Sequence, residues 1–509
     1  MSTVLGLTLR GTLALCVEVE AEVTGGLFAI TIVGLPDASV REARERVRAA
    51  LRTVDIPLRG RVTVNLAPAD IPKEGALLDL ALAVALACRT GAIDEVPPAL
   101  FMGELALDGR LRRVRGAVPA ALLARTMGLP LFVPLENVSE VALVEGVVAY
   151  GVPDLPALFA HLRGEAELSP VASCEIPEHE AEPDPDMADV KGQFQAKRGL
   201  EIAAAGHHNI FLVGSPGSGK TMLARALRGI LPPLSKEDFM EVLLVRSTLG
   251  VTVEDGRRPP YRAVHHTATL PAICGGGSGL RPGEISRAHR GVLFLDEFPE
   301  FPRELVEALR QPLEDGEIVV SRASGSVTYP SRVLLVAAAN PCPCGNDGDP
   351  SEPCRCSASE RERYARRLSG PILDRIDLYV SVPRLTPEEL VAVEGHGAES
   401  SADIRRRVTA ARERQRVRWA SFGYGCNAEV PEKLLRRELR LGNAERRFLE
   451  DAARRCRLSG RGLARILRVA RTVADLEGAD AVGTAHLAEA LAYRQGGNAW
   501  TTGSRRFSS

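Results

Sequence analysis

The sequence contains few aromatic residues, no long apolar run and almost no net charge. Aromatic residues make up 4% of its 509 residues, and 64 Lys and Arg balance 65 Asp and Glu. The net charge of -1 therefore indicates no particular partner. The longest apolar stretch, residues 76–88, has 13 residues and includes Asp79. Because a helix needs about 20 apolar residues to cross a bilayer, we expect no membrane-spanning segment.

Cysteine is too sparse for a scaffold held together by disulfides. The chain has 10 Cys in 509 residues, whereas small secreted domains are far richer in cysteine. The N-terminal sequence MSTVLGLTLRGTLALC has no basic start, and Arg10 interrupts its apolar run. This pattern argues against a signal peptide. We therefore expect a cytoplasmic protein with reduced thiols.

The order of predicted elements indicates an α/β protein of about three domains. Residues 1–163 alternate strands with helices and predict a compact α/β domain. Residues 164–188 are Pro-rich and acidic, which is typical of a linker, and a second α/β pattern covers residues 189–384. Residues 385–494 are helical, and we expect residues 495–509 to be a disordered tail. Residues 400–509 carry 23 Lys or Arg against 12 Asp or Glu, which is consistent with an anionic partner.

The most specific motif is a phosphate-binding loop between a strand and a helix. Residues 209–213 predict a buried strand, residues 222–230 predict a helix, and GSPGSGKT between them matches GxxxxGK[ST]. The glycines let backbone N–H groups approach phosphate oxygens, and the helix N-terminus adds partial positive charge. Lys220 is expected to reach the β- and γ-phosphates, and Thr221 to hold Mg²⁺. The predicted nucleotide contacts are Gly214, Ser215, Pro216, Gly217, Ser218, Gly219, Lys220, Thr221, Met222 and Gln193.

Two further strand ends carry polar side chains suited to ATP hydrolysis. The strand at 291–295 ends at Asp296 and Glu297, and the strand at 332–339 ends at Asn340. Asp296 is expected to coordinate Mg²⁺, Glu297 to polarise an attacking water, and Asn340 to orient that water. Each residue alone is most simply a polar group at a strand end. Together with the phosphate-binding loop, the three favour nucleotide hydrolysis.

Three arginines have two open interpretations. Arg375 precedes a predicted strand at 378–382, and Arg461 and Arg465 lie one helical turn apart. Surface ion pairs are the usual role of arginine. Alternatively, Arg375 projects toward the γ-phosphate of a neighbouring subunit, and Arg461 or Arg465 reaches the nucleotide from a lid. The sequence alone favours neither interpretation.

These motifs lie in longer segments that resemble one family. RAVHHTATLPAICGGGSGLRPGEISRAHRGVLFLDEFPEF, LRQPLEDGEIVVSR, AAANPCPCG and LSGPILDRID are similar to the magnesium-chelatase-like AAA+ ATPases of the YifB/ComM group. The resemblance covers nearly the whole chain: an N-terminal domain, an AAA+ core and a C-terminal helical lid. It implies hexameric rings whose active sites are shared between subunits.

The resemblance also assigns roles to residues. Asp296 and Glu297 become the Walker B pair, Asn340 becomes sensor 1, and Arg375 becomes the arginine finger. Arg461 is the first candidate for sensor 2 and Arg465 the second.

The function that the resemblance implies is a DNA motor. ComM-type members imply a helicase that drives branch migration in recombination during natural transformation, acting on single-stranded or branched DNA with recombination proteins as partners. The alternative is a chelatase-type or protein-remodelling ATPase without a direct DNA role, although no porphyrin-handling domain is visible. A nucleotide switch without catalysis is a third option, and the intact Glu297 argues against it.

A predicted hairpin bears on the substrate. Residues 317–322 and 325–329 predict two strands around a turn at 323–326. A similar hairpin in MCM-type helicases projects into the pore, and Arg322 would then contact the DNA backbone. The alternative is a solvated charge on an ordinary hairpin. Because Tyr329 is the only aromatic residue nearby, a grip on the backbone is favoured over base stacking.

Four cysteines follow Asn340 in an Asp-, Gly- and Pro-rich segment. Cys342 and Cys344 are separated by nine residues from Cys354 and Cys356. Four thiolates suit tetrahedral Zn²⁺ in a structural role. The alternatives are free thiols or one disulfide formed under oxidation. Adjacent His265 and His266 rarely share a metal, and we expect them to make a loop contact or to face DNA.

The N-terminal domain resembles the Lon-protease-like fold of the ribosomal S5 domain 2 type, through NLAPADIPKEG and GELALDGRLRRV. This raises the possibility of an ATP-dependent Ser-Lys protease. At the position of the nucleophile, however, the chain has Ala76-Leu77-Leu78, and at the position of the lysine it has Ala117-Val118-Pro119. Without a hydroxyl and an amine no nucleophile is activated. We predict a binding or ring-stacking module, with Arg110, Arg112, Arg113 and Arg115 as DNA contacts or a solvated basic face.

Overall fold

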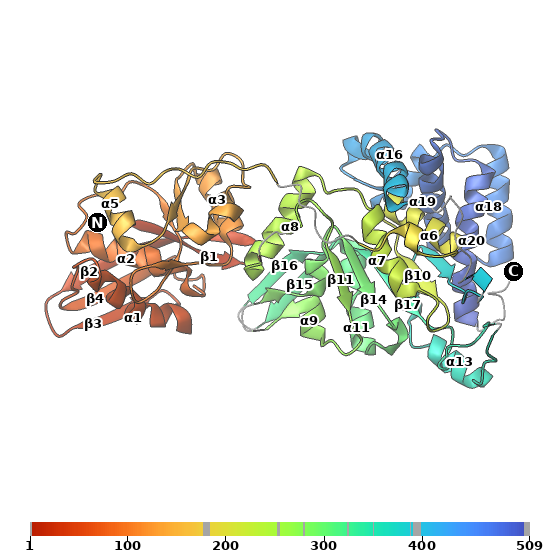
Figure 1. Ribbon diagram of the computed structural model, residues 1–509, viewed down its shortest axis with the longest axis horizontal. Coiled ribbons are helices and arrows are strands. Elements are labelled where there is room, and N and C mark those ends of the chain that lie inside the picture. The colour runs from red at the N-terminus through yellow and green to blue at the C-terminus, as the bar shows by residue number, and fades with distance from the viewer. Residues whose placement is uncertain are drawn as a thin grey trace.

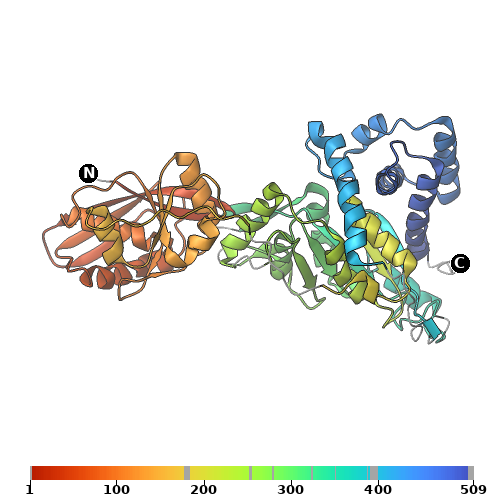
Figure 2. The ribbon, with the colours of Figure 1, turned by 45° about the horizontal axis from the view of Figure 1, so that its top comes forward.

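The computed structural model describes residues 3–176, 184–251, 255–277, 280–322, 325–349, 351–386, 388–389 and 399–502. The molecule is elongated, with the N-terminal domain at one end, a parallel-sheet core in the middle and C-terminal helices at the other end (Figure 1). The same order is seen after a turn of 45° (Figure 2). The predicted α/β class with a parallel sheet and a C-terminal helical region is confirmed.

The N-terminal domain is built on a seven-stranded mixed sheet with the order β3-β4-β2-β1-β5-β8-β9. Strand β4 alternates buried and more exposed side chains, as expected for a strand with one face on a core. The sheet strands are β1 Val4–Arg10, β2 Leu13–Thr24, β3 Ala29–Val33, β4 Arg61–Ala67, β5 Leu100–Phe101, β8 Leu131–Pro134 and β9 Ala149–Val152, and β6 Glu104–Leu105 pairs with β7 Leu111–Arg112. The helices are α1 Ala38–Arg52, α2 Asp79–Arg89, α3 Ala117–Met127, α4 Val138–Val141 and α5 Leu155–Leu162.

Helix α2 explains the longest apolar run of the sequence. Its residues from Asp79 to Ala87 are all buried, so the helix lies within the domain core. Burial raises the pKa of Asp79 to about 6, although Arg46 binds this carboxylate with Nε 2.7 Å from Oδ2. None of the described helices is both long and apolar enough to cross a membrane.

Five parallel strands form the sheet of the core, in the order β11-β14-β17-β10-β18. Ile210 and Leu212 of β10 face a cluster that includes α6, α7 and α16, whereas Phe211 and Val213 face a second cluster on the other side. Strands covered on both faces are continuously apolar, which is why residues 209–213 show no alternation. The strands are β10 Ile210–Val213, β11 Tyr261–Val264, β14 Val292–Leu295, β17 Leu334–Ala339 and β18 Leu378–Ser381.

Helices and two short hairpins surround this sheet. The helices are α6 Phe194–Gly206, α7 Lys220–Ile230, α8 Lys236–Leu249, α9 Leu270–Cys274, α10 Glu284–Arg287, α11 Arg303–Ala308, α12 Arg310–Asp315, α13 Ala358–Ala365 and α14 Gly370–Leu373. The hairpins are β12 Gly275–Gly276 with β13 Arg281–Pro282, and β15 Glu317–Arg322 with β16 Gly325–Pro330.

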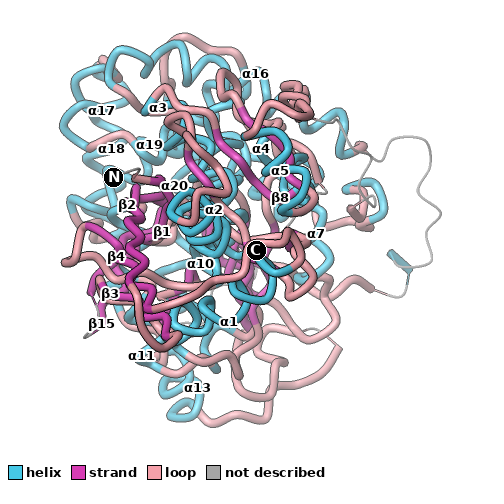
Figure 3. Tube along the Cα trace, turned by 90° about the vertical axis from the view of Figure 1, so that its left-hand side faces the viewer, coloured by secondary structure: helices cyan, strands magenta, loops and turns pink. Residues whose placement is uncertain are grey.

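The N-terminal domain is joined to the core through α3 and α8. Phe239 and Val242 of α8 lie in one apolar cluster with residues of the N-terminal domain. The backbone N–H of Gly116 donates to the carbonyl of Ser247 at 2.8 Å, and that of Val118 donates to the Ser247 hydroxyl at 3.1 Å. Viewed along the long axis, this domain lies in front of the rest of the molecule (Figure 3).

The expected linker makes contacts at both of its ends, and the first part of the expected tail is helical. Val171 donates its backbone N–H to Ala149 at 2.8 Å, and Met187 is fully buried, so the segment 164–188 makes contacts at both ends. Residues 177–183 of this segment lie outside the described residues. Helix α20 continues through Thr502, beyond residue 495 where the tail was expected to begin, and residues 503–509 also lie outside the described part.

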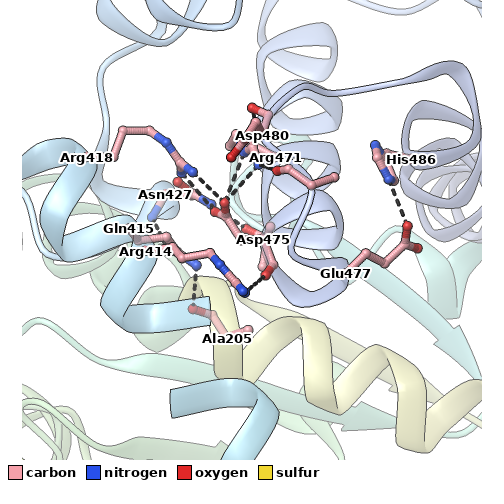
Figure 4. Close-up of polar contacts among 12 residues, drawn as sticks. Ala205, Arg414, Gln415, Arg418, Asn427, Arg471, Asp475, Glu477, Asp480 and His486 are labelled. Carbon is pink, nitrogen blue, oxygen red and sulfur yellow. Dashed lines mark hydrogen bonds and ion pairs between the residues drawn. The ribbon is translucent and has the colours of Figure 1, made fainter. Parts of the chain in front are cut away.

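The C-terminal helices are held together by a buried carboxylate. They are α16 Ser401–Trp419, α17 Glu432–Glu438, α18 Asn443–Cys456, α19 Gly460–Glu477 and α20 Thr484–Thr502. Asp475 of α19 is fully buried and binds Arg418 of α16, Arg471 and Asn427, with oxygen–nitrogen distances of 2.6, 2.9 and 2.9 Å (Figure 4). A buried charge requires such compensation, so this network fixes α16 against α19.

We predict that Asp475→Asn destabilises these helices by about 3–5 kcal/mol, because Arg418 and Arg471 would lose the charge that compensates them in the interior. Trp419, whose Nε1 donates to Asn427 at 2.8 Å, provides a fluorescence signal for urea unfolding. Glu477→Gln is the matched control, since Glu477 pairs with His486 at the surface and its side chain is 52% exposed. That variant should lose less than about 1 kcal/mol. Equal losses of unfolding free energy in both variants would contradict the role of Asp475 in holding α16 against α19.

Candidate nucleotide-binding site

The segment 214–221 turns from the end of β10 into α7 as a phosphate-binding loop. Gly217 and Gly219 have φ of +77° and +94°, a region that glycine adopts without steric cost. At Gly214 a Cβ atom would lie 2.0 Å from the carbonyl oxygen of Val382, so this position requires glycine. Helix α7 begins after Gly219 without a side-chain cap, and its first backbone N–H groups are therefore available to an anion.

Lys220 lies buried within this loop. Its Nζ donates to the carbonyls of Gly214 and Ser215 at 2.7 and 2.9 Å, and to Asn340 Oδ1 at 3.3 Å. Burial lowers the pKa of Lys220 to about 8, although the charges of Asp296 and Glu297 oppose the shift. The loop lysine therefore lies against the end of β17.

Thr221 and Asp296 together form a pair of oxygen ligands. Thr221 Oγ1 donates to Asp296 Oδ2 at 3.0 Å, and Asp296 Oδ1 accepts the backbone N–H of Glu297 at 2.9 Å. Hydroxyl and carboxylate oxygens are the ligands that Mg²⁺ prefers. The two side chains therefore fit a magnesium ion bound beside the phosphate loop.

Glu297 is positioned by an unusual backbone and by a histidine. Its φ is +52°, a left-handed conformation that is uncommon outside glycine. His266 Nδ1 lies 3.1 Å from Glu297 Oε2, and His265 Nδ1 lies 2.9 Å from Thr267 Oγ1. Of the two expectations, a loop contact or a DNA-facing role, the contacts agree with the first: His265 contacts Thr267, and His266 contacts the predicted catalytic carboxylate of Glu297. The signal was present in the sequence, because these histidines follow β11 at the same edge of the sheet.

Gln193 and Met222 lie at the border of the loop. The Gln193 side chain is buried, and its Nε2 donates to the carbonyls of Ser218 and Pro383 at 3.3 and 2.6 Å. The Gln193 side chain therefore supports the phosphate loop by a hydrogen bond to the backbone of the loop. Met222 is 37% exposed on α7.

The three candidate arginines gather at a different place. Arg375, Arg461 and Arg465 line one cavity together with Glu314 and Asp377. The same cavity is lined by Asn209, which precedes β10, whereas the phosphate loop follows the other end of β10. Since four strand residues span about 13 Å, the arginines lie at the amino edge of the sheet and the phosphate loop at its carboxyl edge.

Two of these arginines are paired within the chain. Arg375 binds Glu314 and donates from Nη1 to the carbonyl of Pro371 at 2.7 Å. Arg465 Nε lies 3.4 Å from Asp377 Oδ1, and burial lowers the pKa of Arg465. Ion pairs are therefore present, but they are not the surface pairs of the first interpretation, because the Arg375 and Arg465 side chains are only 11% and 12% exposed. Arg461 and Arg465 line the cavity at the amino edge of the sheet, away from the phosphate loop.

The four predicted cysteine ligands come together. Cys342 Sγ lies 3.3 Å from Cys344 Sγ and 3.6 Å from Cys354 Sγ, and all four sulfurs, including that of Cys356, lie within 4.8 Å of one another. Desolvation acts to raise the pKa of Cys344, but hydrogen bonds from the backbone of Asn346 and Arg355 lower it to about 6. The donor set is one that fits a thiophilic metal ion.

The hairpin β15–β16 is present, with Arg322 paired to Gly325 in the register. Residues 323 and 324 of the predicted turn lie outside the described residues. Tyr329 is buried and donates its hydroxyl to the Leu280 carbonyl at 2.6 Å, so it is not available for stacking. A second hairpin, β12–β13, was not predicted, although the glycines of CGGGSGLRP are typical of a turn.

The two hairpins lie side by side. A Cβ atom on Gly276 would lie 3.2 Å from Arg322 Nη2, and Gly276 pairs with Arg281. Arg281 and Arg322 are both exposed, so two basic side chains occupy one surface.

In the N-terminal domain, the positions expected for protease residues are apolar and largely buried. Leu77 and Leu78 are buried, as are Ala117, Val118 and Pro119. The basic face is partly neutralised, because Arg110 binds Asp108, Arg112 binds Glu104 and Arg113 binds Glu140.

Lys220 is a buried lysine at a helix N-terminus, and it lies beside Asp296 and Asn340, which end neighbouring parallel strands. This arrangement defines the phosphate site of a P-loop nucleoside triphosphatase. Comparison with known families narrows this class. Residues 186–390 match the profile described as magnesium chelatase, subunit ChlI, residues 19–137 match that of subunit ChlI of Mg-chelatase, and residues 398–494 match that of its C-terminal part.

Individual relatives agree with the profiles. The chain is 45% identical over 508 residues to an uncharacterized protein of Mycobacterium tuberculosis, covering 98% of each chain. It is 41% identical over 494 residues to competence protein ComM of Haemophilus influenzae, covering 95% of each, and 41% identical over 485 residues to YifB of Escherichia coli, covering 94% of each. The chain belongs to the YifB/ComM family of magnesium-chelatase-like AAA+ ATPases.

The pKa of Lys220 generates a prediction. Because the free protein loses the Lys220 charge near pH 8, ATP affinity should fall above that pH, approaching about tenfold per pH unit. Binding of a fluorescent ATP analogue between pH 7 and 10 measures this. Lys220→Arg is the control: its guanidinium does not titrate in this range, so the affinity of that variant should not vary with pH. The same pH slope in both proteins would assign the effect to another group.

Proposed function

We propose that the protein is an ATP-hydrolysing motor that assembles as a hexamer and moves along single-stranded or branched DNA. The observation that carries the proposal is the separation of the catalytic groups. Lys220, Asp296 and Asn340 lie at the carboxyl edge of the sheet, whereas Arg375 lines a cavity at the amino edge. A complete catalytic set therefore requires a second copy of the chain.

Each residue has a role in the proposed shared site. Lys220 and the N–H groups of α7 hold the phosphates, and Thr221 and Asp296 hold Mg²⁺. Glu297 takes the proton of the attacking water, which Asn340 orients. Arg375 of an adjacent protomer stabilises the charge that develops on the γ-phosphate. Arg461 and Arg465, which line the same cavity as Arg375, would serve that same neighbouring nucleotide.

The two adjacent hairpins favour DNA as the proposed substrate. Arg322 and Arg281 are exposed on neighbouring β-hairpins, and the one aromatic side chain nearby, Tyr329, is buried. Arginines without stacking partners suit a grip on phosphates that does not depend on sequence. In a ring, these hairpins would face the central pore.

The remaining parts have supporting roles in the proposal. The N-terminal domain is a Lon-like module without protease activity that stacks rings or binds partners. The cofactors are ATP with Mg²⁺, and a structural Zn²⁺ at Cys342, Cys344, Cys354 and Cys356. Recombination during natural transformation, in the cytoplasm and with recombination proteins as partners, is the proposed process, because one relative is named competence protein ComM.

A protein-remodelling or chelatase-type ATPase is the second candidate. It is favoured by 29% identity over 330 residues to a magnesium-chelatase 38 kDa subunit of Cereibacter sphaeroides, a match that covers 58% of this chain and 87% of that one. This candidate predicts ATP hydrolysis that does not respond to DNA.

Arg375 provides a test of the shared site. Arg375→Ala should keep ATP binding but lower hydrolysis by about 10³-fold or more, as for other arginines that act in trans. Mixing it with Lys220→Ala, which should be inactive alone, should restore activity, because some interfaces then combine an intact loop with an intact Arg375. Steady-state phosphate release at several mixing ratios measures the rescue. Absence of rescue in an assembled mixture would refute the sharing of sites.

Arg322 and Arg281 provide a test of the DNA grip. Single-stranded and forked DNA should stimulate the ATPase rate of the unmodified protein and support strand displacement at low salt. Arg322→Ala and Arg281→Ala should reduce this stimulation by about tenfold while leaving the rate without DNA unchanged. Arg366→Ala is the matched control, since Arg366 is an exposed arginine of the parallel-sheet domain that pairs with Glu362 at the surface. Undiminished stimulation in the double hairpin variant would contradict the role of the hairpins, and no stimulation of the unmodified protein would favour the second candidate.

A further inference from the structure

The segment that follows β17, residues 340–349 and 351–356, runs beside the phosphate-binding loop, and we call it the cysteine loop. Gly214 donates its backbone N–H to the Ala339 carbonyl at 3.2 Å, and Lys220 donates to Asn340 Oδ1 at 3.3 Å. Further along, a Cβ atom on Gly345 would lie 2.5 Å from Pro216 Cδ. The backbone of Gly345 therefore rests directly on the phosphate loop.

The same stretch carries the four cysteines. Cys342 and Cys344 lie between the two contacts at Asn340 and Gly345, and Cys354 and Cys356 return to them from the other end of the cysteine loop. The backbone N–H of Gly345 donates to the Cys342 carbonyl at 3.0 Å, which forms a tight turn around the first sulfur pair. A ligand that ties the four sulfurs together thus also fixes the position of Gly345.

The spacing of the sulfurs fits zinc. A tetrahedron with Zn–S bonds of about 2.3 Å has S–S edges of about 3.8 Å. The distances among Cys342, Cys344 and Cys354 are 3.3, 3.6 and 3.7 Å. A disulfide would use only two sulfurs, whereas here three lie at nearly equal distances and the fourth lies within reach.

A positively charged side chain, Arg361, lies next to the four cysteines and favours their thiolate form. Arg361 of α13 donates from Nη1 to the Cys356 carbonyl at 3.2 Å and lies 3.8 Å from Cys354 Sγ. A positive side chain beside metal-bound thiolates offsets their excess negative charge and orients them.

We propose that Zn²⁺ bound by Cys342, Cys344, Cys354 and Cys356 holds the cysteine loop against Pro216, so that metal binding and nucleotide binding are energetically coupled. The metal fixes Gly345, Gly345 supports the phosphate loop, and an ordered phosphate loop binds ATP with less loss of conformational freedom. Coupling between two sites is reciprocal in binding free energy, so bound nucleotide must in turn raise the affinity of the four cysteines for zinc. The inference rests on the proposed ATP site but not on DNA or on ring assembly.

The first experiment measures zinc in the full-length protein. Metal analysis should find about one zinc per chain in the unmodified protein and in Cys174→Ser, a control at an exposed cysteine outside the cluster. The double variant Cys354→Ser/Cys356→Ser should contain none, and its affinity for a fluorescent ATP analogue should be reduced about tenfold. Absence of zinc from the unmodified protein, purified and reconstituted with zinc, would overturn the proposal.

The second experiment needs no change to the cluster and so does not depend on the folding of a cysteine variant. Zinc is allowed to reach equilibrium between the protein and a chromogenic chelator, with and without a non-hydrolysable ATP analogue and Mg²⁺. The analogue should raise the zinc affinity about threefold or more, and it should have no effect in Lys220→Ala. Equal zinc affinities at saturating, bound analogue would overturn the coupling. If the analogue does not bind the unmodified protein, the ATP site itself is refuted, while the zinc content still tests the metal site.

Discussion

The parallel pairing of β10 with β17, and of β17 with β14, is the constraint on which the rest of the molecule depends. Parallel strands end at one edge, so residues far apart in the sequence meet there. Lys220 is thereby placed against Asn340, 120 positions away, and Thr221 against Asp296, 75 positions away. The phosphate site is a consequence of strand direction, and the surrounding apolar clusters keep these short strands in register.

The same sheet explains why the proposed catalytic groups are divided. Its carboxyl edge holds the phosphate loop, and its amino edge holds Arg375 and Arg465 with their carboxylate partners. Within one chain these arginines pair with Glu314 and Asp377, which compensates their charge, although Arg375 Nε and Arg465 Nη1 are buried without a hydrogen-bond partner among the described residues. Such an arrangement suits a protein whose active sites are completed by assembly.

Two loops that leave the carboxyl edge of the sheet contact different parts of the nucleotide site. His266 follows β11 and contacts Glu297, and the cysteine loop follows β17 and contacts Pro216. The hairpin β15–β16, which carries Arg322, lies on the side of the core nearest the N-terminal domain (Figure 1), where Arg10 donates to the Ser326 carbonyl at 3.4 Å. In the proposed motor, the sheet of the core would therefore connect the nucleotide site to the substrate contact.

The sequence by itself determined the α/β class, the phosphate loop, and the strand ends at Asp296 and Asn340, because these depend on local patterns of apolar residues, glycine and charge. It also indicated the four cysteines, whose spacing is local. It did not determine the contact of His266 with Glu297, the position of Arg461 and Arg465 in one cavity with Arg375, or the contact of Gly345 with Pro216. Those were decided by tertiary structure alone, since each joins segments whose distance depends on strand order and helix packing rather than on sequence separation.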